Sequence, residues 1–305
     1  MSIRTTGGVS RSFIHLHIAI LLAGLTGVLG RLITLNEGLL VWYRMLFSTV
    51  GLLLLGVMGK GIPRVPRSGI LRLVGVGTVI ALHWVAFYGS IKYSNVSIGL
   101  VCFSAIGFFT AVLGPLISRR PFDWVDCLLG LVVMLGIWLI FSFDGSHGTG
   151  ILLGVLSALL GALFTILNKS MVTAYGSEAV TFYELGGGWM VLTLLLPFYI
   201  AAFPSGHMLP TLTDFLWLLV LSMLCTVLAF RLSVGALRDI SPFTVNLSYN
   251  LEPVYGILLA FLIYREDRHL DAGFAWGFAV ILLSVAFQSL RVWLKGKAVR
   301  AEARP

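Results

Sequence analysis

The segments LLAGLTGVLGR (residues 21–31) and LLGALFTILNK (residues 159–169) decide the fold, because the second repeats the residue pattern of the first. Both are apolar runs with glycine, alanine and one threonine, and both end in a cation, Arg31 or Lys169. Each lies in a stretch of about 20 apolar residues, which as a helix would cross the roughly 30 Å hydrocarbon layer of a bilayer. The sequence therefore predicts membrane-spanning helices that are related by an internal repeat.

Ten stretches of this kind follow one another and leave almost no sequence for a soluble domain. The composition agrees, since the 305 residues are 58% hydrophobic and 11% charged with a mean hydropathy of +0.97, whereas globular proteins are roughly 25% charged. We expect an all-α polytopic protein of the cell (inner) membrane, surrounded by the lipid bilayer. The predicted spans are residues 13–33, 38–59, 69–91, 95–117, 124–143, 149–170, 180–202, 212–236, 243–264 and 271–293.

The repeat extends beyond the first pair of segments. Residues 42–44 (Trp-Tyr-Arg) match residues 182–184 (Phe-Tyr-Glu), and Val96-Ser97 matches Ile240-Ser241. Because five spans are an odd number, the second half must enter the membrane from the opposite side, which makes the halves inverted repeats. The alternative is that membrane helices rich in Leu, Gly and Val resemble each other by composition. The predicted division is a first five-helix repeat at 1–145, a second at 146–294 and a basic cytoplasmic tail at 295–305.

The basic residues predict the orientation of the chain. With both termini in the cytoplasm, 16 of the 21 Lys and Arg residues fall on the cytoplasmic side, as the positive-inside rule requires. The formal net charge of +8 does not indicate nucleic-acid binding, because these residues are spread over short turns and the C-terminal end. We expect cytoplasmic termini and no nucleic-acid partner, and the sequence leaves a homodimer open.

Motifs of enzymes are absent from the sequence. It contains no His-Glu-x-x-His, no Gly-x-Ser-x-Gly and no phosphate-binding Gly-Lys-Ser loop. Cys102, Cys127 and Cys225 lack the spacing of metal ligands, so we expect no metal site and no other cofactor. A secondary transporter for a small-molecule substrate is the favoured hypothesis. A non-transporting membrane receptor or scaffold is the alternative.

The ninth predicted helix carries a family resemblance. Its entry Ile240-Ser241-Pro242, its pair Glu252-Pro253 and its ending Tyr264-Arg265-Glu266, together with two five-helix halves, resemble the EamA-type branch of the drug/metabolite transporter superfamily. The first half departs from this pattern, because Gly107-Phe108-Phe109 and Gly114-Pro115 stand where a Glu-Pro pair is expected. The resemblance implies a secondary transporter, commonly an exporter of amino acids or other small metabolites. Organic cations or drugs, nucleosides and sugars remain alternative substrates.

Arg44, Glu184 and Glu252 are ionisable residues within predicted spans. An ionised group in hydrocarbon costs several kcal/mol and normally faces a cavity or a partner. Arg44 and Glu184 lie near opposite membrane surfaces and cannot reach each other, so Arg44 needs another anion. Glu37, Glu252 or a substrate carboxylate could supply it. We assign Arg44, Glu184 and Glu252 to gating or coupling, with a permanent pair between Arg44 and Glu37 or Glu252 as the structural alternative.

The ninth helix combines a helix break with polar residues. Pro253 lacks the N–H that would bond the carbonyl of Tyr249, so we expect a break at this point. On a continuous helix Asn246, Tyr249 and Asn250 share one face with Pro253, whereas Glu252 lies on nearly the opposite face. The asparagine face is the favoured cavity lining, because uncharged donors and acceptors suit a site that must release its ligand.

The third predicted helix carries a cluster of aromatic residues. His83 and Phe87 lie one turn apart, as do Trp84 and Tyr88. Tyr88 fits the aromatic belt at the membrane interface, whereas His83 lies deeper, where an imidazole could bind substrate or carry a proton near neutral pH. A histidine bonded only to a helix carbonyl is the structural alternative. The predicted substrate-binding residues are His83, Trp84, Phe87, Asn246, Tyr249 and Asn250.

These residues predict a site at the centre of helices one, three, six, seven, eight and nine. Arg44 suits a carboxylate, Glu252 suits an amine and the aromatic side chains suit an apolar group, so an amino acid is the favoured substrate. Alternating access of the two halves around this site is the expected mechanism. The sequence does not distinguish ion coupling from facilitated diffusion.

Overall fold

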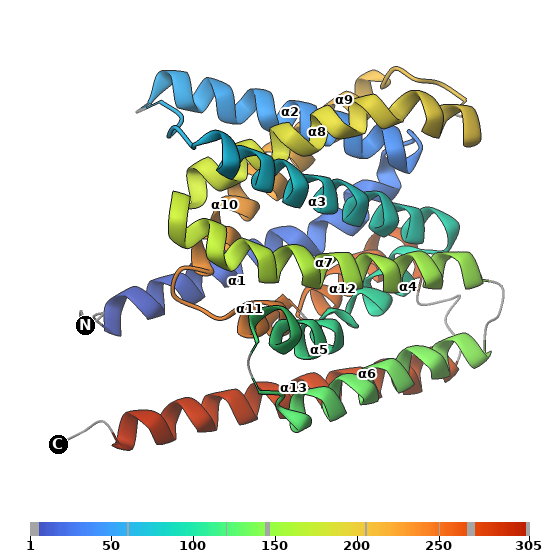
Figure 1. Cartoon of the computed structure of the whole chain (residues 1–305). Helices are drawn as coiled ribbons and strands as arrows, with labels where there is room; N and C mark the ends of the chain where they lie inside the picture. Colours follow the sequence, from blue (N-terminus) through green and yellow to red (C-terminus); the bar gives the residue numbers. More distant parts are fainter. Residues whose placement is uncertain are drawn as a thin grey trace.

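The computed structural model describes residues 6–59, 61–119, 121–143, 147–204, 206–249, 251–266 and 272–302. Over these residues the chain forms helices joined by short turns, with no strand, which confirms the expected all-α class. The helices run between two ends of the molecule, and both termini leave from the same end (Figure 1). Their bounds are α1 Thr6–Leu32, α2 Glu37–Met58, α3 Arg67–Tyr93, α4 Val96–Phe103, α5 Ile106–Ser118, α6 Trp124–Phe143, α7 Gly148–Tyr175, α8 Ser177–Ala202, α9 Leu212–Ser222, the π-helix η2 Met223–Leu228, α10 Ala229–Ala236, α11 Pro242–Tyr249, α12 Glu252–Tyr264 and α13 Ala272–Glu302.

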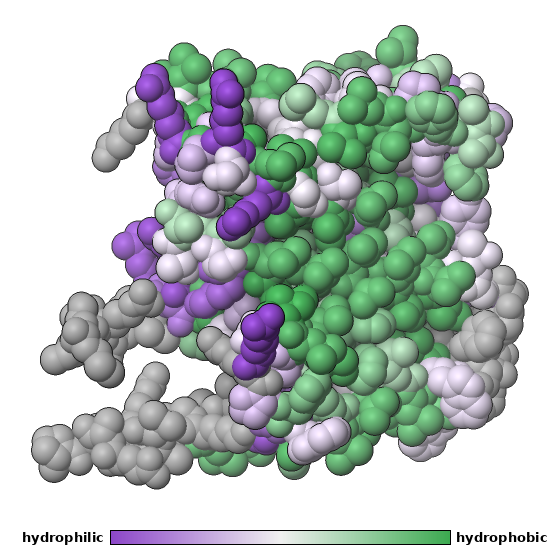
Figure 2. All heavy atoms as spheres, in the orientation of Figure 1, coloured by the Kyte–Doolittle hydropathy of each residue, from purple (hydrophilic) through white to green (hydrophobic). Residues whose placement is uncertain are grey.

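Length and composition qualify many of these helices as membrane spans. Within the described residues, seven helical stretches are long and apolar enough to cross a bilayer: 11–32, 37–58, 67–93, 96–118, 148–175, 177–202 and 212–236. Shorter apolar helices at 124–139, 252–264 and 272–284 fall on the other three expected spans, so the total of ten spans stays a prediction. Figure 2 shows apolar residues across the middle of the visible face and polar residues gathered at the end that carries the termini.

Close helix contacts depend on glycine. At the crossing of α3 and α8, a Cβ atom added to Gly77 would lie 2.1 Å from the backbone oxygen of Glu184, and one added to Gly188 would lie 2.3 Å from the oxygen of Gly77. Only a residue without a side chain allows two helix backbones to approach in this way. Because α3 also packs along α7, the three helices form one continuous layer.

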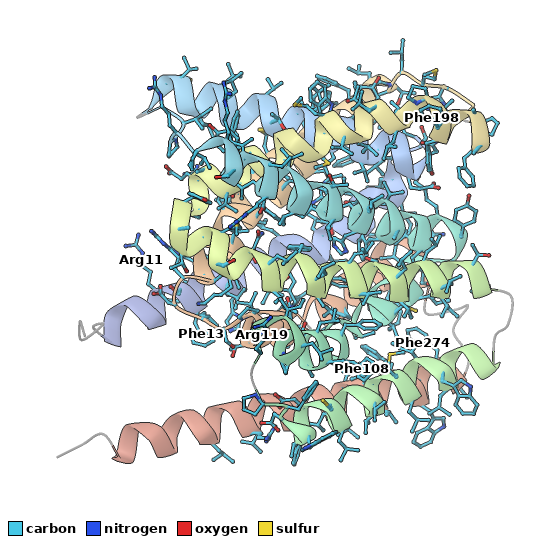
Figure 3. The ribbon with its side chains drawn as sticks, in the orientation of Figure 1. Arg11, Phe13, Phe108, Arg119, Phe198 and Phe274 are labelled. Atoms are coloured by element: carbon cyan, nitrogen blue, oxygen red, sulfur yellow. The ribbon has the colours of Figure 1, made fainter. Side chains whose placement is uncertain are left out.

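A pair of long helices lies at one side of the bundle. α6 and α13 pack mainly against each other and form the lowest layer in Figure 1. Phe108 of α5 and Phe274 of α13 lie where this pair meets the remaining helices (Figure 3), and a Cβ atom on Gly130 of α6 would lie 2.7 Å from Phe108. The pair is therefore joined to the bundle through α5, which packs on α6, and through α11, which packs on α13.

The fourth and ninth predicted spans are each broken into two helices. α4 and α11 each have 8 residues, and α5 and α12 each have 13. The bounds of the second broken span follow those of the first at a constant offset of 146 residues, so that Val96 corresponds to Pro242. Both spans end in an arginine with positive φ, Arg119 at 51° and Arg265 at 56°. This register lies two residues beyond the pairing of Val96 with Ile240 expected from sequence.

Candidate functional site

A central cavity lies between the helices. Residues that flank both helix breaks line it, namely Phe103 and Ile106 in the first broken span and Tyr249 and Glu252 in the second. The remaining walls come from α1, α2, α3, α7, η2 and α10. Contrary to expectation, none of the lining residues belongs to α8, the seventh predicted span. The two breaks therefore open onto one cavity.

Most of the predicted substrate-binding residues meet at this cavity. Asn250 lies outside the described residues. The other five line the cavity: His83, Trp84, Phe87, Asn246 and Tyr249.

Glu252 lines the same cavity as Asn246 and Tyr249, so the expected separation of these residues onto opposite faces was wrong. That expectation assumed a continuous helix at 100° per residue, whereas the helix ends at Tyr249 and resumes at Glu252. Pro253 is the second residue of α12, where a missing N–H costs no helical hydrogen bond. The break therefore brings asparagine, tyrosine and carboxylate to one surface.

His83 is buried in an aromatic environment. Its Nδ1 atom lies 2.8 Å from the carbonyl oxygen and 3.0 Å from Oγ of Ser157 on α7. A nitrogen bonded to a carbonyl must carry the proton, so neutral His83 offers Nε2 as an acceptor. The ring stacks on Phe87 with centroids 6.4 Å apart and lies close to Phe103 and Phe164. The structure thus combines the carbonyl contact and the cavity position, which were weighed as alternatives.

Neutral groups bind the guanidinium of Arg44. Its Nε donates to Oγ1 of Thr226 at 2.7 Å and its Nη1 donates to the Tyr88 hydroxyl at 2.7 Å. The guanidinium carbon lies 3.8 Å from the centroid of the Trp84 ring, which adds a cation–π interaction. Arg44 forms no ion pair with Glu37 or Glu252 in the described part of the chain, so a permanent pair with either residue was the wrong structural alternative.

The contacts of Glu37, Tyr88 and Thr226 explain this arrangement of Arg44. The Tyr199 hydroxyl donates to Oε1 of Glu37 at 2.6 Å, so Glu37 has its own partner. Tyr88 is fully buried, and its assignment to the interfacial belt was wrong because its hydroxyl is an acceptor for Arg44. Thr226 lies in the π-helix and donates to the carbonyl of Leu221 at 2.8 Å. Neither residue was predicted as a partner of Arg44: Tyr88 was assigned to the interfacial belt, and no sequence signal marked the π-helix that carries Thr226.

Glu252 is the acidic group of the cavity. Its side chain is 4% exposed and lines the cavity that Arg44 also lines. No hydrogen bond or ion pair to its carboxylate is found within the described ranges. A buried carboxylate without a protein partner is unfavourable unless a bound cation or donor-rich ligand compensates it. The cavity thus offers strong acceptors at Glu252 and at His83 Nε2.

Glu184 lies outside the cavity, although it was grouped with Arg44 and Glu252. It is fully buried in α8, and one carboxylate oxygen, Oε2, accepts a hydrogen bond of 3.0 Å from Nδ2 of Asn168 on α7. The lining residues of the cavity include Thr165, one turn before Asn168. Glu184 therefore lies behind the cavity wall formed by α7.

A polar cluster fastens the helices at the end opposite the termini. Glu266 forms an ion pair with Arg31 at the end of α1. It also accepts hydrogen bonds from the N–H groups of Val96 and Ser97 and from the Ser97 hydroxyl, at 3.2, 3.0 and 2.6 Å. The Tyr264 hydroxyl donates to a carbonyl of α1 at 2.8 Å. We call Arg31, Ser97 and Glu266 the latch, because they join the ends of α1 and α12 to the start of α4.

A family of known proteins matches nearly the whole chain. The model of the EamA-like transporter family matches it twice, at residues 12–142 and 148–290. An uncharacterized transporter of Archaeoglobus fulgidus is 25% identical over 239 residues, which are 74% of this chain and 79% of that protein.

Two proteins of Bacillus subtilis are also similar. The uncharacterized transporter YxxF is 24% identical over 230 residues, which cover 72% of this chain and 71% of YxxF. The uncharacterized transporter YetK is 24% identical over 285 residues, which cover 87% of this chain and 84% of YetK. One protein of known crystal structure shares the fold with a TM-score of 0.67 at 14% identity, covering 92% of this chain and 98% of its own.

Proposed function

Because this chain belongs to the EamA-like transporter family and is a multi-pass membrane transporter, we propose that it exports amino acids or related small metabolites by alternating access. In this proposal ten spans form two inverted five-helix repeats, with both termini and the basic tail in the cytoplasm. The constant offset of 146 residues between the two broken spans supports the repeat. The family match in each half supports it independently.

The Glu252 carboxylate carries the substrate proposal. It is buried, faces the cavity and has no protein partner among the described side chains. An ammonium group would compensate its charge and donate up to three hydrogen bonds. His83 Nε2 is a second acceptor on the same cavity. A substrate with a primary amine therefore fits the acidic part of the cavity.

The rest of the cavity fits the other parts of an amino acid. Arg44 lies on the cavity wall, and its guanidinium keeps N–H groups beyond those bonded to Thr226 and Tyr88. These donors suit a carboxylate. Phe103, Phe164 and Phe230 form an apolar wall, which suits an apolar side chain. An organic cation is the second candidate, because Arg44 already has three neutral acceptors and an aromatic ring.

The latch supports a conformation closed at the end opposite the termini. On the outer side of the cavity a Cβ atom at Gly30 would lie 2.2 Å from the Tyr88 ring, so α1 and α3 are in close contact there. Toward the other end the cavity is lined by Ser233 and Leu237 near the end of α10. We assign this arrangement to the inward-facing state of an alternating-access cycle.

Counterflow in proteoliposomes tests the proposal. Proteoliposomes that contain the purified protein are loaded with one unlabelled compound and assayed for uptake of the same compound in labelled form. The compounds tested are amino acids, their decarboxylated amines, organic cations, nucleosides and sugars. We expect saturable exchange of amino acids, and a half-saturation concentration at least about tenfold higher in Glu252→Gln, since about 1.4 kcal/mol of binding energy is tenfold in affinity.

Glu178→Gln is the matched control, because Glu178 is an exposed acid paired with Arg231 at 2.5 Å away from the cavity. This variant should exchange like the wild type. Exchange of the amines but not of the amino acids would favour the organic-cation candidate. Exchange of amino acids that is unchanged in Glu252→Gln would contradict the role given to Glu252.

A further inference from the structure

A second buried acid lies apart from the substrate cavity. Glu184 of α8 and Asn168 of α7 are both 0% exposed, and one hydrogen bond of 3.0 Å joins Nδ2 of Asn168 to Oε2 of Glu184. The other oxygen of each group, Glu184 Oε1 and Asn168 Oδ1, has no hydrogen-bond partner in the described part of the chain. The same two side chains therefore hold two unsatisfied acceptors and no donor for either.

One added proton on Glu184 Oε1 would supply the donor that Asn168 Oδ1 lacks, and a bond between them would satisfy both oxygens. A carboxylic acid and a primary amide form a cyclic pair in which the amide N–H donates to one acid oxygen and the acid O–H donates to the amide oxygen. An ionised Glu184 would instead place a buried charge beside an unpaired amide oxygen, which is costly in a water-free interior. We propose that Glu184 is held as the neutral acid and that the Glu184–Asn168 pair is the proton-binding site of this transporter.

Among the described residues, no cationic side chain forms an ion pair with Glu184. α8 packs against α2, α3, α7 and α10. The charged side chains and His83 on those helices have contacts elsewhere. On α2 and α3, Glu37 is bonded to Tyr199, Arg44 to Tyr88 and Thr226, His83 to Ser157 and Lys92 to the Ile33 carbonyl. On α7 and α10, Lys169 donates to the carbonyls of Leu237, Arg238 and Ile240, and Arg231 pairs with Glu178. Arg67 and Arg72 are exposed near the start of α3. With no cationic side chain bonded to Glu184 among the described residues, we assign a proton as the cation of this site.

The position of the pair couples it to the cavity. Asn168 lies one turn after Thr165 of the cavity wall, and the backbone of Glu184 touches Gly77 of α3, the helix that also carries His83. Loss of this proton would leave a buried carboxylate facing the amide oxygen, and the repulsion between the two would favour a different packing of α7 against α8. This step rests on the proposed transport function, since it makes the proton the coupling ion of the cycle.

Infrared difference spectroscopy tests the protonation itself. Spectra of purified wild type and of Glu184→Gln in nanodiscs at neutral pH differ by the carbonyl stretch of a protonated carboxyl group if Glu184 is neutral. Asn168→Leu should keep this band and shift it, because the hydrogen bonds of the acid are lost. Glu178→Gln, an exposed acid on the same helix, should leave the band unchanged. Absence of an acid band assigned to Glu184 would overturn the proposal without any reference to transport.

Transport against a pH gradient tests the coupling. We expect a proton gradient to drive accumulation of the exchanged substrate in the wild type and in Glu178→Gln. In Glu184→Gln the loss of accumulation should exceed any loss of counterflow. Wild-type counterflow of no compound would refute the proposed function, while the infrared result would still stand. Full gradient-driven accumulation in Glu184→Gln would overturn the coupling while leaving transport intact.

Discussion

The guanidinium of Arg44 shows how one buried charge can be held without an opposite charge. Its N–H groups go to hydroxyls of Tyr88 and Thr226 and to the carbonyl of Cys225, and the Trp84 ring covers one face. Hydroxyl and carbonyl dipoles disperse the charge without neutralising it. A substrate carboxylate could therefore approach without first displacing a protein carboxylate.

Removal of the Tyr88 hydroxyl should destabilise this arrangement. Tyr88→Phe leaves a buried N–H of Arg44 without its acceptor, and a hydrogen bond to a charged group is worth about 1.5–3 kcal/mol. We expect a lower thermal unfolding temperature of the purified protein in detergent and weaker substrate exchange. Tyr93→Phe on the same helix is the control, since Tyr93 is 49% exposed. Equal unfolding temperatures for the two variants would contradict this role of Tyr88.

The sequence predicted the composition of the cavity better than its internal bonds. His83, Trp84 and Phe87 could be found because an imidazole and aromatic rings at helical spacing stand out in an apolar helix. Tyr88 was misplaced because depth in the membrane was judged from its distance to the helix end. The partner of Arg44 was sought among acids, whereas the structure supplies the hydroxyls of Tyr88 on α3 and of Thr226 on the π-helix. Contacts between residues so far apart in the chain leave no local sequence signal.

At the scale of elements, the latch ties three helix ends together through one carboxylate. Glu266 accepts two backbone N–H groups at the start of α4, where the helix dipole favours a negative charge. It also accepts the Ser97 hydroxyl and pairs with Arg31. Charge-assisted hydrogen bonds of this kind are roughly twice as strong as neutral ones. We therefore expect the proposed closure at this end to depend on the charge of Glu266.

Neutralising Glu266 should open that end of the cavity. Cys225 lines the cavity, so it can report access in a background of Cys102→Ala and Cys127→Ala. We expect a membrane-impermeant thiol reagent added at the side opposite the termini to label Cys225 several-fold faster in Glu266→Gln than in the parent.

The matched control for this experiment is Glu178→Gln, which neutralises an acid in the ion pair with Arg231 on another part of the surface. Its labelling from that side should equal that of the parent. If Glu266→Gln also labels at the parent rate, the latch does not keep the cavity closed.

The broken helices show what sequence reasoning could and could not predict about elements. Pro253 indicated a break in the ninth span, and the helix does end close to it. The matching break after Phe103 has glycine at residue 107, the position that corresponds to Pro253 at the offset of 146. Proline is therefore not required for the break. Packing around the shared cavity is common to both sites, and packing between distant helices cannot be read from a single span.

At the scale of the whole molecule, the orientation of the chain can be tested directly. Arg11 and Arg119 lie at the end that carries the termini, whereas Phe198 lies toward the other end (Figure 3). The positive-inside rule predicts that the basic end is cytoplasmic. We expect a green fluorescent protein fused to the C-terminus to fluoresce and an alkaline phosphatase fused there to be inactive.

The matched control for orientation is a pair of fusions truncated after residue 204, at the other end of α8. There the phosphatase should be active and the fluorescent protein dark. The reverse result at both positions would show that the chain enters the membrane with its termini outside.

Hydropathy alone was sufficient to predict an all-α membrane protein, because the thickness of the bilayer sets a similar length for every membrane-spanning helix. Each expected span falls on helical sequence, although α6, α12 and α13 are shorter as apolar helices than the bilayer requires. The layers they form could not be predicted, because lipid-facing and protein-facing leucines look alike. α13 illustrates this, since Trp276 is 70% exposed whereas Phe274 is 5% exposed.

The positive φ angles of Arg119 and Arg265 carry a consequence for how this sequence can vary. A residue with a side chain pays about 1–2 kcal/mol in the left-handed region, whereas glycine does not. A cation at the C-terminal end of a helix recovers part of this cost, typically about 0.3–1 kcal/mol. Glycine would remove the conformational strain at these two positions, whereas arginine keeps a positive charge at the C-terminal end of the helix. We therefore expect substitutions at these two positions to favour residues that tolerate the left-handed region or that carry a positive charge.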